Sequence, residues 1–202
     1  MIALVSLGLL IRAARWHYYL HVLDWRIPLR PSLLAFIASI ALTATPGKAG
    51  ELIKLVLLRS RFHISLTEGS GILLIERLGD LVAVMVLAAG GLTLFVDLRS
   101  YFVISLLLVS TAALFISSPA LRRMLLLRVT RIPRLRTVGQ RLIAMGDTMN
   151  TLLRPLPCLV GGVLAIVAWS CEAYAFYFLI GRFGISSSPL ISASIFGFST
   201  LA

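Results

Sequence analysis

Long, nearly unbroken apolar blocks separated by short basic or proline-containing connections dominate the sequence. A helix of about 18 or more apolar residues is long enough to cross the hydrocarbon core of a bilayer. The blocks predict helices over residues 2–22, 66–96, 101–116 and 155–180, and a further apolar segment begins at Leu190, inside which the sequence ends. The pattern therefore predicts an all-α integral membrane protein built as a polytopic helix bundle.

The segment from Leu33 to Leu58 departs from this pattern, because the residues PGKAGE interrupt it. Pro46, Gly47 and Gly50 break a helix at this point. Each apolar half has about 10 to 14 residues, too few to span a membrane. Two interpretations remain open, a single kinked spanning helix and a re-entrant hairpin with PGKAGE at its tip, and the second is preferred. In either one the broken backbone must be buried in protein or line a wet cavity.

The net charge of +11 raises the question of nucleic-acid binding, but only 13% of the residues are charged and 59% are hydrophobic. The basic residues cluster between apolar blocks, and no soluble RNA- or DNA-binding motif accompanies them. The stretch from Arg122 to Arg154 holds eight arginines and one acidic residue, Asp147. We expect this stretch to be cytoplasmic in a multi-pass protein of the cell membrane. The expected partners are membrane lipids, anionic ones in particular, and no nucleic acid.

The distribution of arginines also favours the re-entrant hairpin. If residues 33–58 return to the side on which they start, four arginines fall on the same side as the stretch 122–154: Arg26, Arg30, Arg59 and Arg61. Only Arg99 and Arg182 then fall on the opposite side. A full crossing by residues 33–58 would divide the first group, against the bias of positive charge toward the cytoplasm.

A weak internal symmetry accompanies the hairpin. A helix, a proline-flanked link and a re-entrant segment occupy residues 2–58. From Pro155 onward a helix, a link from Ser186 to Pro189 and a short apolar segment follow in the same order. The two halves would enter the membrane from opposite faces, as in transporters built from inverted repeats with broken helices. We treat residues 1–202 as a single transmembrane domain.

Ionisable residues inside apolar segments are costly and indicate a functional site. Such residues lie in three places: Lys48, Glu51 and Lys54 across the break, Glu76, Arg77 and Asp80 in the motif ERLGD, and Glu172 among Trp169, Tyr174 and Tyr177. One interpretation is structural, with Glu51 neutralising Lys48 or Lys54 and Arg77 pairing with Asp80. For Lys48 and Arg77 a functional interpretation is preferred, because cations beside a helix N-terminus near Gly47 make an anion site suited to phosphate.

Other chemistry is sparse. His17 and His21 have the spacing of a metal pair, but no third ligand is evident and an interfacial position is preferred. The mixed cationic and aromatic end of the first helix also indicates the membrane interface: Arg12, Arg15, Trp16, Tyr18 and Tyr19. Cys158 and Cys171 are too far apart on one helix for a disulfide. We find no catalytic residues, no metal site and no cofactor site, so a role other than catalysis is preferred.

Three motifs together carry a resemblance: RAARWHYYL, TPGKAGELIKLVLLR and IERLGDL. With them the sequence resembles the lysylphosphatidylglycerol synthase/flippase transmembrane family, also called flippase-like membrane proteins. The resemblance implies an α-helical membrane domain that moves or handles a lipid with an anionic headgroup. It carries the following motif residues over to this chain: Pro46, Gly47, Gly50, Glu51, Glu76, Arg77 and Asp80.

Departures from the family limit what the resemblance implies. The family's second glycine-rich proline motif does not appear before the sequence ends at FGFSTLA, and the family's first helix is also lacking, so we expect a truncated member. There is no soluble aminoacyl-transferase domain, so synthesis of the lipid is not expected. Two alternatives stay open: a membrane-embedded transferase in lipid or cell-envelope glycolipid modification, and a non-transporting assembly subunit.

The sequence thus predicts a flippase-like transporter for an anionic phospholipid or a polyprenyl-linked headgroup. The predicted headgroup-binding residues are Pro46, Gly47, Lys48, Gly50, Glu51 and Arg77. The predicted charge network around them consists of Lys54, Glu76, Asp80 and Glu172.

Overall fold

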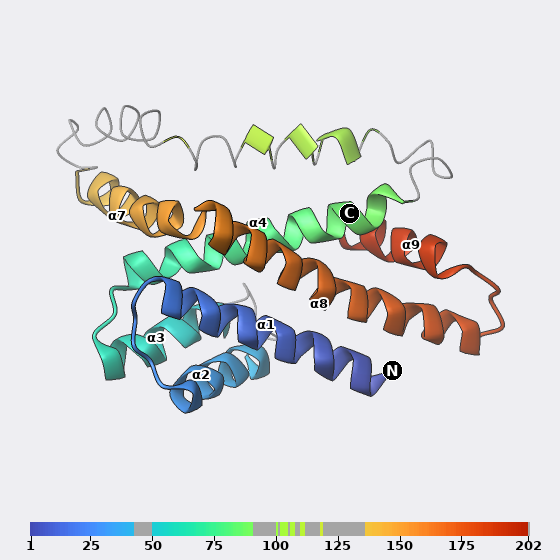
Figure 1. Ribbon diagram of the computed structural model, residues 1–202, viewed down its shortest axis with the longest axis horizontal. Helices are drawn as coiled ribbons and strands as arrows, with labels where there is room; N and C mark the ends of the chain where they lie inside the picture. The colour runs from blue at the N-terminus through green and yellow to red at the C-terminus, as the bar shows by residue number, and fades with distance from the viewer. Residues whose placement is uncertain are drawn as a thin grey trace. The chain divides into compact units, whose positions relative to one another are not determined.

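The computed structural model describes residues 1–42, 50–90 and 136–201, together with residues 100, 102–104, 106–107, 110–111 and 118. Every regular element in these residues is an α-helix (Figure 1). The helices are α1 (Ile2–Val22), α2 (Leu29–Ala41), α3 (Gly50–Phe62), α4 (Leu66–Ala89), α7 (Arg136–Leu152), α8 (Pro155–Arg182) and α9 (Pro189–Leu201). The all-helical architecture that the apolar blocks predict is therefore present.

The predicted helix boundaries agree closely with the structure at both ends of the chain. Helix α1 has the predicted bounds, and α8 starts at the predicted Pro155 and continues to Arg182. Helix α4 starts at the predicted Leu66 and ends at Ala89, before the predicted end. Residues 91–96 and most of the predicted helix 101–116 lie outside the described residues.

Only α8 among the described helices is long and apolar enough, by length and composition, to cross a membrane on its own. Helices α1 and α4 have 21 and 24 residues, which is long enough. Charged residues make them less apolar, since α1 carries two arginines and the middle of α4 carries the motif ERLGD. Membrane spans by α1 and α4 therefore stay a prediction, and the charges that the sequence analysis identifies within them need protein partners.

The chain divides into two compact units. The first unit comprises residues 1–15, 77–112 and 159–202, and the second comprises residues 16–76 and 113–158. Helices α1 and α4 contribute residues to both units.

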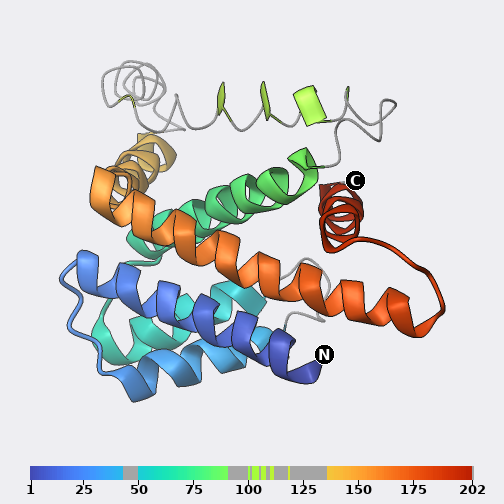
Figure 2. The same cartoon turned by 45° about the vertical axis from the view of Figure 1, so that its right-hand side comes forward.

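Helices α2 and α3 of the second unit form an antiparallel hairpin (Figures 1 and 2). At one end, a Cβ atom on Gly50 would lie 2.5 Å from the carbonyl carbon of Leu42 and 2.7 Å from the Ser39 oxygen. At the other end, Pro31 of α2 and Phe62 of α3 line the same cleft. Since the start of α3 lies beside the end of α2, the two halves cannot be one kinked helix, and that interpretation is wrong.

Helix α7 packs on α4 within the second unit. A Cβ atom on Gly71 of α4 would lie 2.8 Å from the carbonyl oxygen of Met145 and 3.0 Å from the Cβ of Thr148. Met149 and Leu152 on α7 are also buried. The sequence predicts only a solvated basic stretch over residues 122–154, whereas residues 136–152 form an amphipathic helix with one buried face.

Small residues bring the helices of the first unit close together. A Cβ atom on Gly8 of α1 would lie 3.1 Å from the carbonyl oxygen of Ala168 on α8, and the two helices run in opposite directions (Figure 1). A Cβ atom on Gly197 of α9 would lie 2.7 Å from the backbone nitrogen of Ala88 on α4. Such contacts between small residues are typical of helix pairs in membranes.

Helices α1 and α8 end in the same way. At the end of α1, the Trp25 N–H donates to the Leu20 oxygen at 2.9 Å and the Asp24 N–H to the His21 oxygen at 2.9 Å. At the end of α8, the Ile185 N–H donates to the Ile180 oxygen and the Gly184 N–H to the Gly181 oxygen, both at 3.2 Å. Both ends are Schellman motifs, with left-handed residues at Asp24 (φ 56°) and Gly184 (φ 77°).

The helices that follow these two ends also correspond. Asp24 and Gly184 are 160 residues apart, and so are Ser32 and Ser192, in the first turns of α2 and α9. Both serines are fully buried. Helices α2 and α9 each have 13 residues. A helix, a link and a shorter helix thus follow one another in both places, and the inverted repeat stays a prediction.

Candidate functional site

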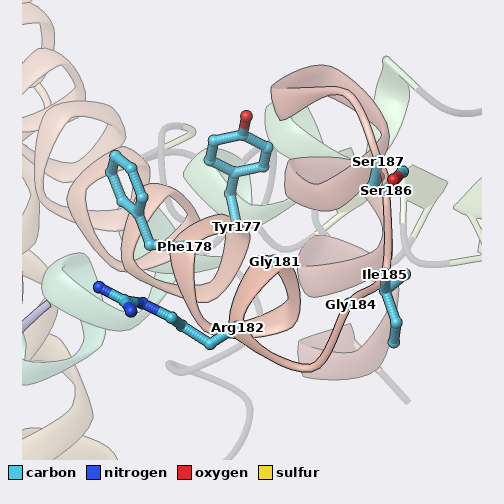
Figure 3. A pocket seen from close by; sticks show the side chains of 8 residues that line it. All are labelled: Tyr177, Phe178, Gly181, Arg182, Gly184, Ile185, Ser186 and Ser187. Carbon is cyan, nitrogen blue, oxygen red and sulfur yellow. The ribbon is translucent and has the colours of Figure 1, made fainter.

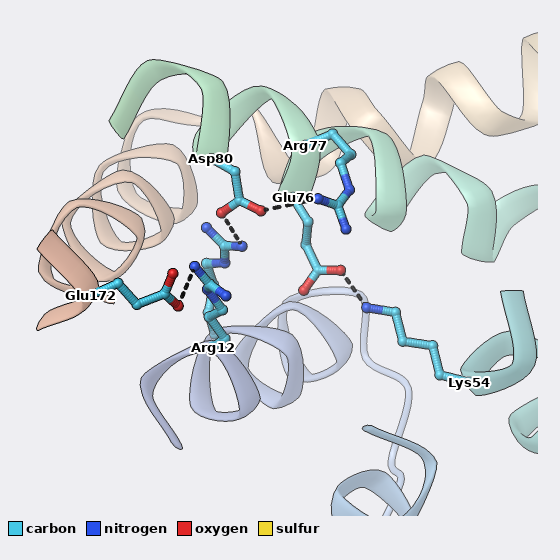
Figure 4. Close-up of polar contacts among 7 residues, drawn as sticks. Arg12, Lys54, Glu76, Arg77, Asp80 and Glu172 are labelled. Carbon is cyan, nitrogen blue, oxygen red and sulfur yellow. Dashed lines mark hydrogen bonds and ion pairs between the residues drawn. The ribbon is translucent and has the colours of Figure 1, made fainter. Parts of the chain in front are cut away.

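A buried ion pair joins α3 to α4 in the second unit. The Lys54 Nζ lies 2.5 Å from the Glu76 Oε2, and the two side chains are only 6% and 8% exposed (Figure 4). The ammonium of Lys54 also lies 4.1 Å from the ring centroid of Trp16 on α1 and 5.8 Å from that of Phe36 on α2. A cation between a carboxylate and aromatic faces is stabilised by both.

The local sequence explains this placement. Lys54 lies on the same face of α3 as Leu58, one turn later, and both are buried. Glu76 on α4 follows Ile72 and Ile75 on a buried face. Each charge alone would be costly in such surroundings, and pairing removes most of that cost.

A second group of charges lies in the first unit (Figure 4). The Arg15 Nη2 of α1 lies 2.7 Å from the Asp80 Oδ1 of α4, and the Arg12 Nη2 lies 2.8 Å from the Glu172 Oε1 of α8. The Arg77 Nη1 is 3.8 Å from the other oxygen of Asp80. This group therefore contains three arginines and two carboxylates, and so carries one more positive than negative charge.

The two arginines beside Asp80 differ in their surroundings. The Arg15 side chain is 2% exposed, whereas the Arg77 side chain is 48% exposed. A Cβ atom on Gly79 would lie 3.5 Å from the Arg15 Nη1, so the glycine leaves room for the guanidinium. The guanidinium of Arg12 lies 4.4 Å from the ring centroid of Trp169. Arg12 and Arg15 are thus held inside protein, while Arg77 is half accessible.

The structure describes part of the predicted site. Gly50 is the buried first residue of α3, and Glu51 follows it in the same turn. Pro46, Gly47 and Lys48 lie outside the described residues. Of the predicted charge network, Lys54 and Glu76 meet in the second unit, and Asp80 and Glu172 lie in the first unit with Arg77. The role of these residues in headgroup binding stays a prediction.

The sequence interpretation missed the roles of Arg12 and Arg15. It places Arg12, Arg15 and Trp16 at the membrane interface, but Arg15 and Trp16 are buried and both arginines are ion-paired inside the protein. Asp80 has its closest described cation in Arg15, not in the predicted Arg77. The available signal was the spacing of three residues between Arg12 and Arg15, which puts both on one face of α1.

The two histidines of α1 contact each other. The Nε2 atoms of His17 and His21 lie 3.1 Å apart, and the rings meet edge to face. Within the described residues no group of three or more His, Cys, Asp or Glu side chains could hold a metal ion. The pair is therefore a hydrogen bond along one helix face.

A separate pocket of about 480 Å³ lies where α8 ends and the link to α9 begins (Figure 3). Its lining residues are Tyr177, Phe178, Gly181, Arg182, Gly184, Ile185, Ser186 and Ser187. Arg182 extends away from Ser186 and Ser187 in Figure 3. The Arg182 guanidinium and the serine hydroxyls of this pocket therefore do not converge on a common position. None of the residues in the ion pairs described above lines the pocket.

The described residues form helices throughout, and one of these helices is long and apolar enough to cross a membrane, which is consistent with a helical membrane protein. The family model of the lysylphosphatidylglycerol synthase TM region matches residues 1–202, and the chain belongs to this family. No curated protein and no solved structure matches the chain. Membership in the family indicates an integral membrane protein with a function related to membrane lipids.

Proposed function

We propose that the protein is a flippase-like transporter that carries a lipid with an anionic phosphate-containing headgroup across the membrane. The observation that supports this most is the set of ion pairs, two buried and one partly buried, that join otherwise apolar helices. The buried pairs are Arg15–Asp80 and Lys54–Glu76, and the partly buried pair is Arg12–Glu172. Charges in such segments are costly and typically mark the path of a polar substrate.

An ion pair between apolar helices can exchange one of its partners for a charged group of the substrate, which allows that group to be bound and released. Breaking a buried pair by removal of one partner leaves an uncompensated charge, which costs about 3–5 kcal/mol. A phosphate that approaches Arg77 can take the place of a carboxylate as counter-charge, so the exchange leaves no cation alone. The half-exposed guanidinium of Arg77 supports this role for an anion.

The α2–α3 hairpin is proposed to be re-entrant, with residues 46–51 at membrane depth. Each helix has 13 residues and is about 20 Å long, shorter than a hydrocarbon core of about 30 Å. Pro46, Gly47, Lys48, Gly50 and Glu51 are proposed to bind the headgroup at the hairpin tip. Arg77 of α4 is a further proposed headgroup-binding residue.

An inverted repeat is also proposed, with residues 2–42 and 162–202 as its halves. The spacing of 160 residues makes Gly8 equivalent to Ala168 and Arg12 equivalent to Glu172. Gly8 lies against Ala168 and Glu172, while Arg12 pairs with Glu172. A two-fold axis through the point where α1 and α8 cross would bring each position near the axis into contact with its own equivalent. The contacts of Gly8 and Arg12 have this pattern. Inverted repeats of this kind occur in transporters.

The topology and location complete the proposal. Residues 1–202 are proposed to form one transmembrane domain in the plasma membrane, with the basic stretch 122–154 on the cytoplasmic side. Anionic lipids are its proposed partners.

The test is a translocation assay in proteoliposomes with a fluorescent phosphatidylglycerol analogue. We expect Lys48→Ala and Arg77→Ala each to reduce the rate of translocation at least tenfold, while membrane insertion is unchanged. Arg134→Ala removes a cation of the basic stretch and should leave the rate within twofold of the unmodified protein. Transport at the unmodified rate by both the Lys48 and Arg77 variants would contradict the proposal.

A further inference from the structure

A second basic pocket lies in the second unit, away from the buried Lys54–Glu76 pair. It has a volume of about 550 Å³ and lies where α3 ends, α4 begins and α7 passes by. Its lining residues are Arg59, His63, Ile64, Ser65, Leu66, Thr67 and Arg141. Neither member of the buried pair lines it.

The two arginines of this pocket come from different helices. Arg59 belongs to the last turn of α3, and Arg141 lies on α7. Both are exposed, and neither guanidinium forms an ion pair with a carboxylate in the part of the chain that the structure describes. Glu68 in the first turn of α4 does not line the pocket. The described residues that line the pocket therefore include two arginines and no carboxylate.

The link between α3 and α4 lines the pocket, and backbone hydrogen bonds hold its two ends. The His63 N–H donates to the Arg59 oxygen at 3.0 Å, and His63 has the left-handed φ of 58°. The chain then turns directly into α4, where the Gly69 N–H donates to the Ser65 oxygen at 3.0 Å. The positive end of the dipole of this 24-residue helix faces the same pocket as the arginines, and it favours an anion.

The position of Arg141 is fixed by packing. Arg141 precedes Met145 by one helical turn, and Met145 and Thr148 pack against Gly71 of α4. Because glycine allows α7 to approach α4 closely, Arg141 is held over the start of α4. Two guanidinium groups, the Ser65 and Thr67 hydroxyls and the helix dipole thus share one pocket.

We infer that this pocket binds a phosphate group, either as free phosphate or as the phosphodiester of a lipid headgroup. Guanidinium groups match phosphate oxygens in bidentate geometry, and hydroxyls donate to the remaining oxygens. This inference does not rest on transport, because none of the described residues proposed for transport lines the pocket.

The experiment uses the full chain purified in detergent. We compare Arg59→Gln/Arg141→Gln with Arg26→Gln, which also removes cationic charge but from a side chain that does not line the pocket. In one arm, inorganic phosphate is titrated calorimetrically. In the other, mixed micelles that contain phosphatidylglycerol are compared with micelles of phosphatidylcholine.

We expect the double variant to weaken binding at least tenfold in one or both arms, and Arg26→Gln to change it less than twofold. Loss in the phosphate arm assigns free phosphate to the pocket, and loss restricted to phosphatidylglycerol assigns the lipid headgroup. Unchanged binding in both arms, or equal loss in the Arg26 variant, overturns the inference. If the double variant does not fold, Arg59→Lys and Arg141→Lys replace it, and each should weaken binding because lysine cannot bind in bidentate geometry.

Discussion

The ammonium of Lys54 and the carboxylate of Glu76 meet at 2.5 Å inside the second unit, 22 residues apart in the sequence. This contact ties the α2–α3 hairpin to α4, with the Trp16 ring on another side of the ammonium. The pair therefore neutralises two charges and holds three segments of the chain in place.

Loss of either partner of this pair should destabilise the protein. Lys54→Ala leaves Glu76 buried without its cation, and we expect a loss of about 3–5 kcal/mol in the free energy of unfolding. The double variant Lys54→Met/Glu76→Leu removes both charges and should recover most of that loss. Thermal unfolding in detergent measures the effect, and Arg61→Ala, on the exposed face of α3, is the control. A double variant less stable than both single variants would contradict this account.

Gly50 should be intolerant of a side chain. A Cβ atom there would lie 2.5 Å from the Leu42 backbone, so Gly50→Ala must push α3 away from α2. We expect a loss of about 1–3 kcal/mol, as for other overpacked positions. Gly162→Ala on α8 is the matched control, because no atom lies within 4 Å of its added Cβ. It should be neutral or slightly stabilising, since alanine favours a helix over glycine. Equal melting temperatures for the two variants would refute the close contact.

The two arginines beside Asp80 should separate stability from transport. Arg15 is buried at 2.7 Å from Asp80, so Arg15→Ala should lower stability by about 3–5 kcal/mol. Arg77 is half exposed at 3.8 Å from the same carboxylate, so Arg77→Ala should lower it by less than about 1 kcal/mol. Thermal unfolding of both variants in detergent provides the comparison. A larger stability loss for the Arg77 variant would reverse the assignment of Asp80's main partner.

The topology can be tested by cysteine labelling in a variant without Cys158 and Cys171. Thr137→Cys tests the basic stretch and Ser100→Cys tests the connection before residues 101–116, and both positions are exposed. With the basic stretch cytoplasmic, a membrane-impermeant reagent added outside intact cells should label only position 100. Position 137 should react only after the membrane is opened. Labelling of both positions from outside would rule out the proposed orientation.

The sequence predicts features that depend on neighbours along the chain. The bounds of α1 and the start of α8 follow from apolar blocks, and the break between α2 and α3 follows from Pro46, Gly47 and Gly50. The locations of Lys54, Glu76 and Asp80 could also be predicted, because an ionisable residue in an apolar run is conspicuous. Their partners could not, because spacing along a helix reveals only neighbours within one turn.

Arg15 illustrates this limit. Its partner Asp80 is 65 residues away, and a cation near aromatic residues at a helix end equally suits the membrane interface. Helix α7 illustrates another limit, since its buried face is formed by Thr148, Met149 and Leu152 among polar residues. Such a mixed segment has no apolar block, so its sequence does not indicate a buried face. The close contact of Gly71 on α4 with α7 shows which helix it packs against.

The length of the α2–α3 hairpin has a consequence for the energy barrier to a crossing headgroup. Two helices of 13 residues reach about 20 Å, so in the proposed re-entrant placement about 10 Å of hydrocarbon remains beyond their tip. The transfer cost of a charge depends on the thickness of low-dielectric material that it must cross. A headgroup that follows the hairpin would therefore cross roughly a third of the ordinary hydrocarbon thickness. The hairpin would thus act as a local thinning of the low-dielectric layer.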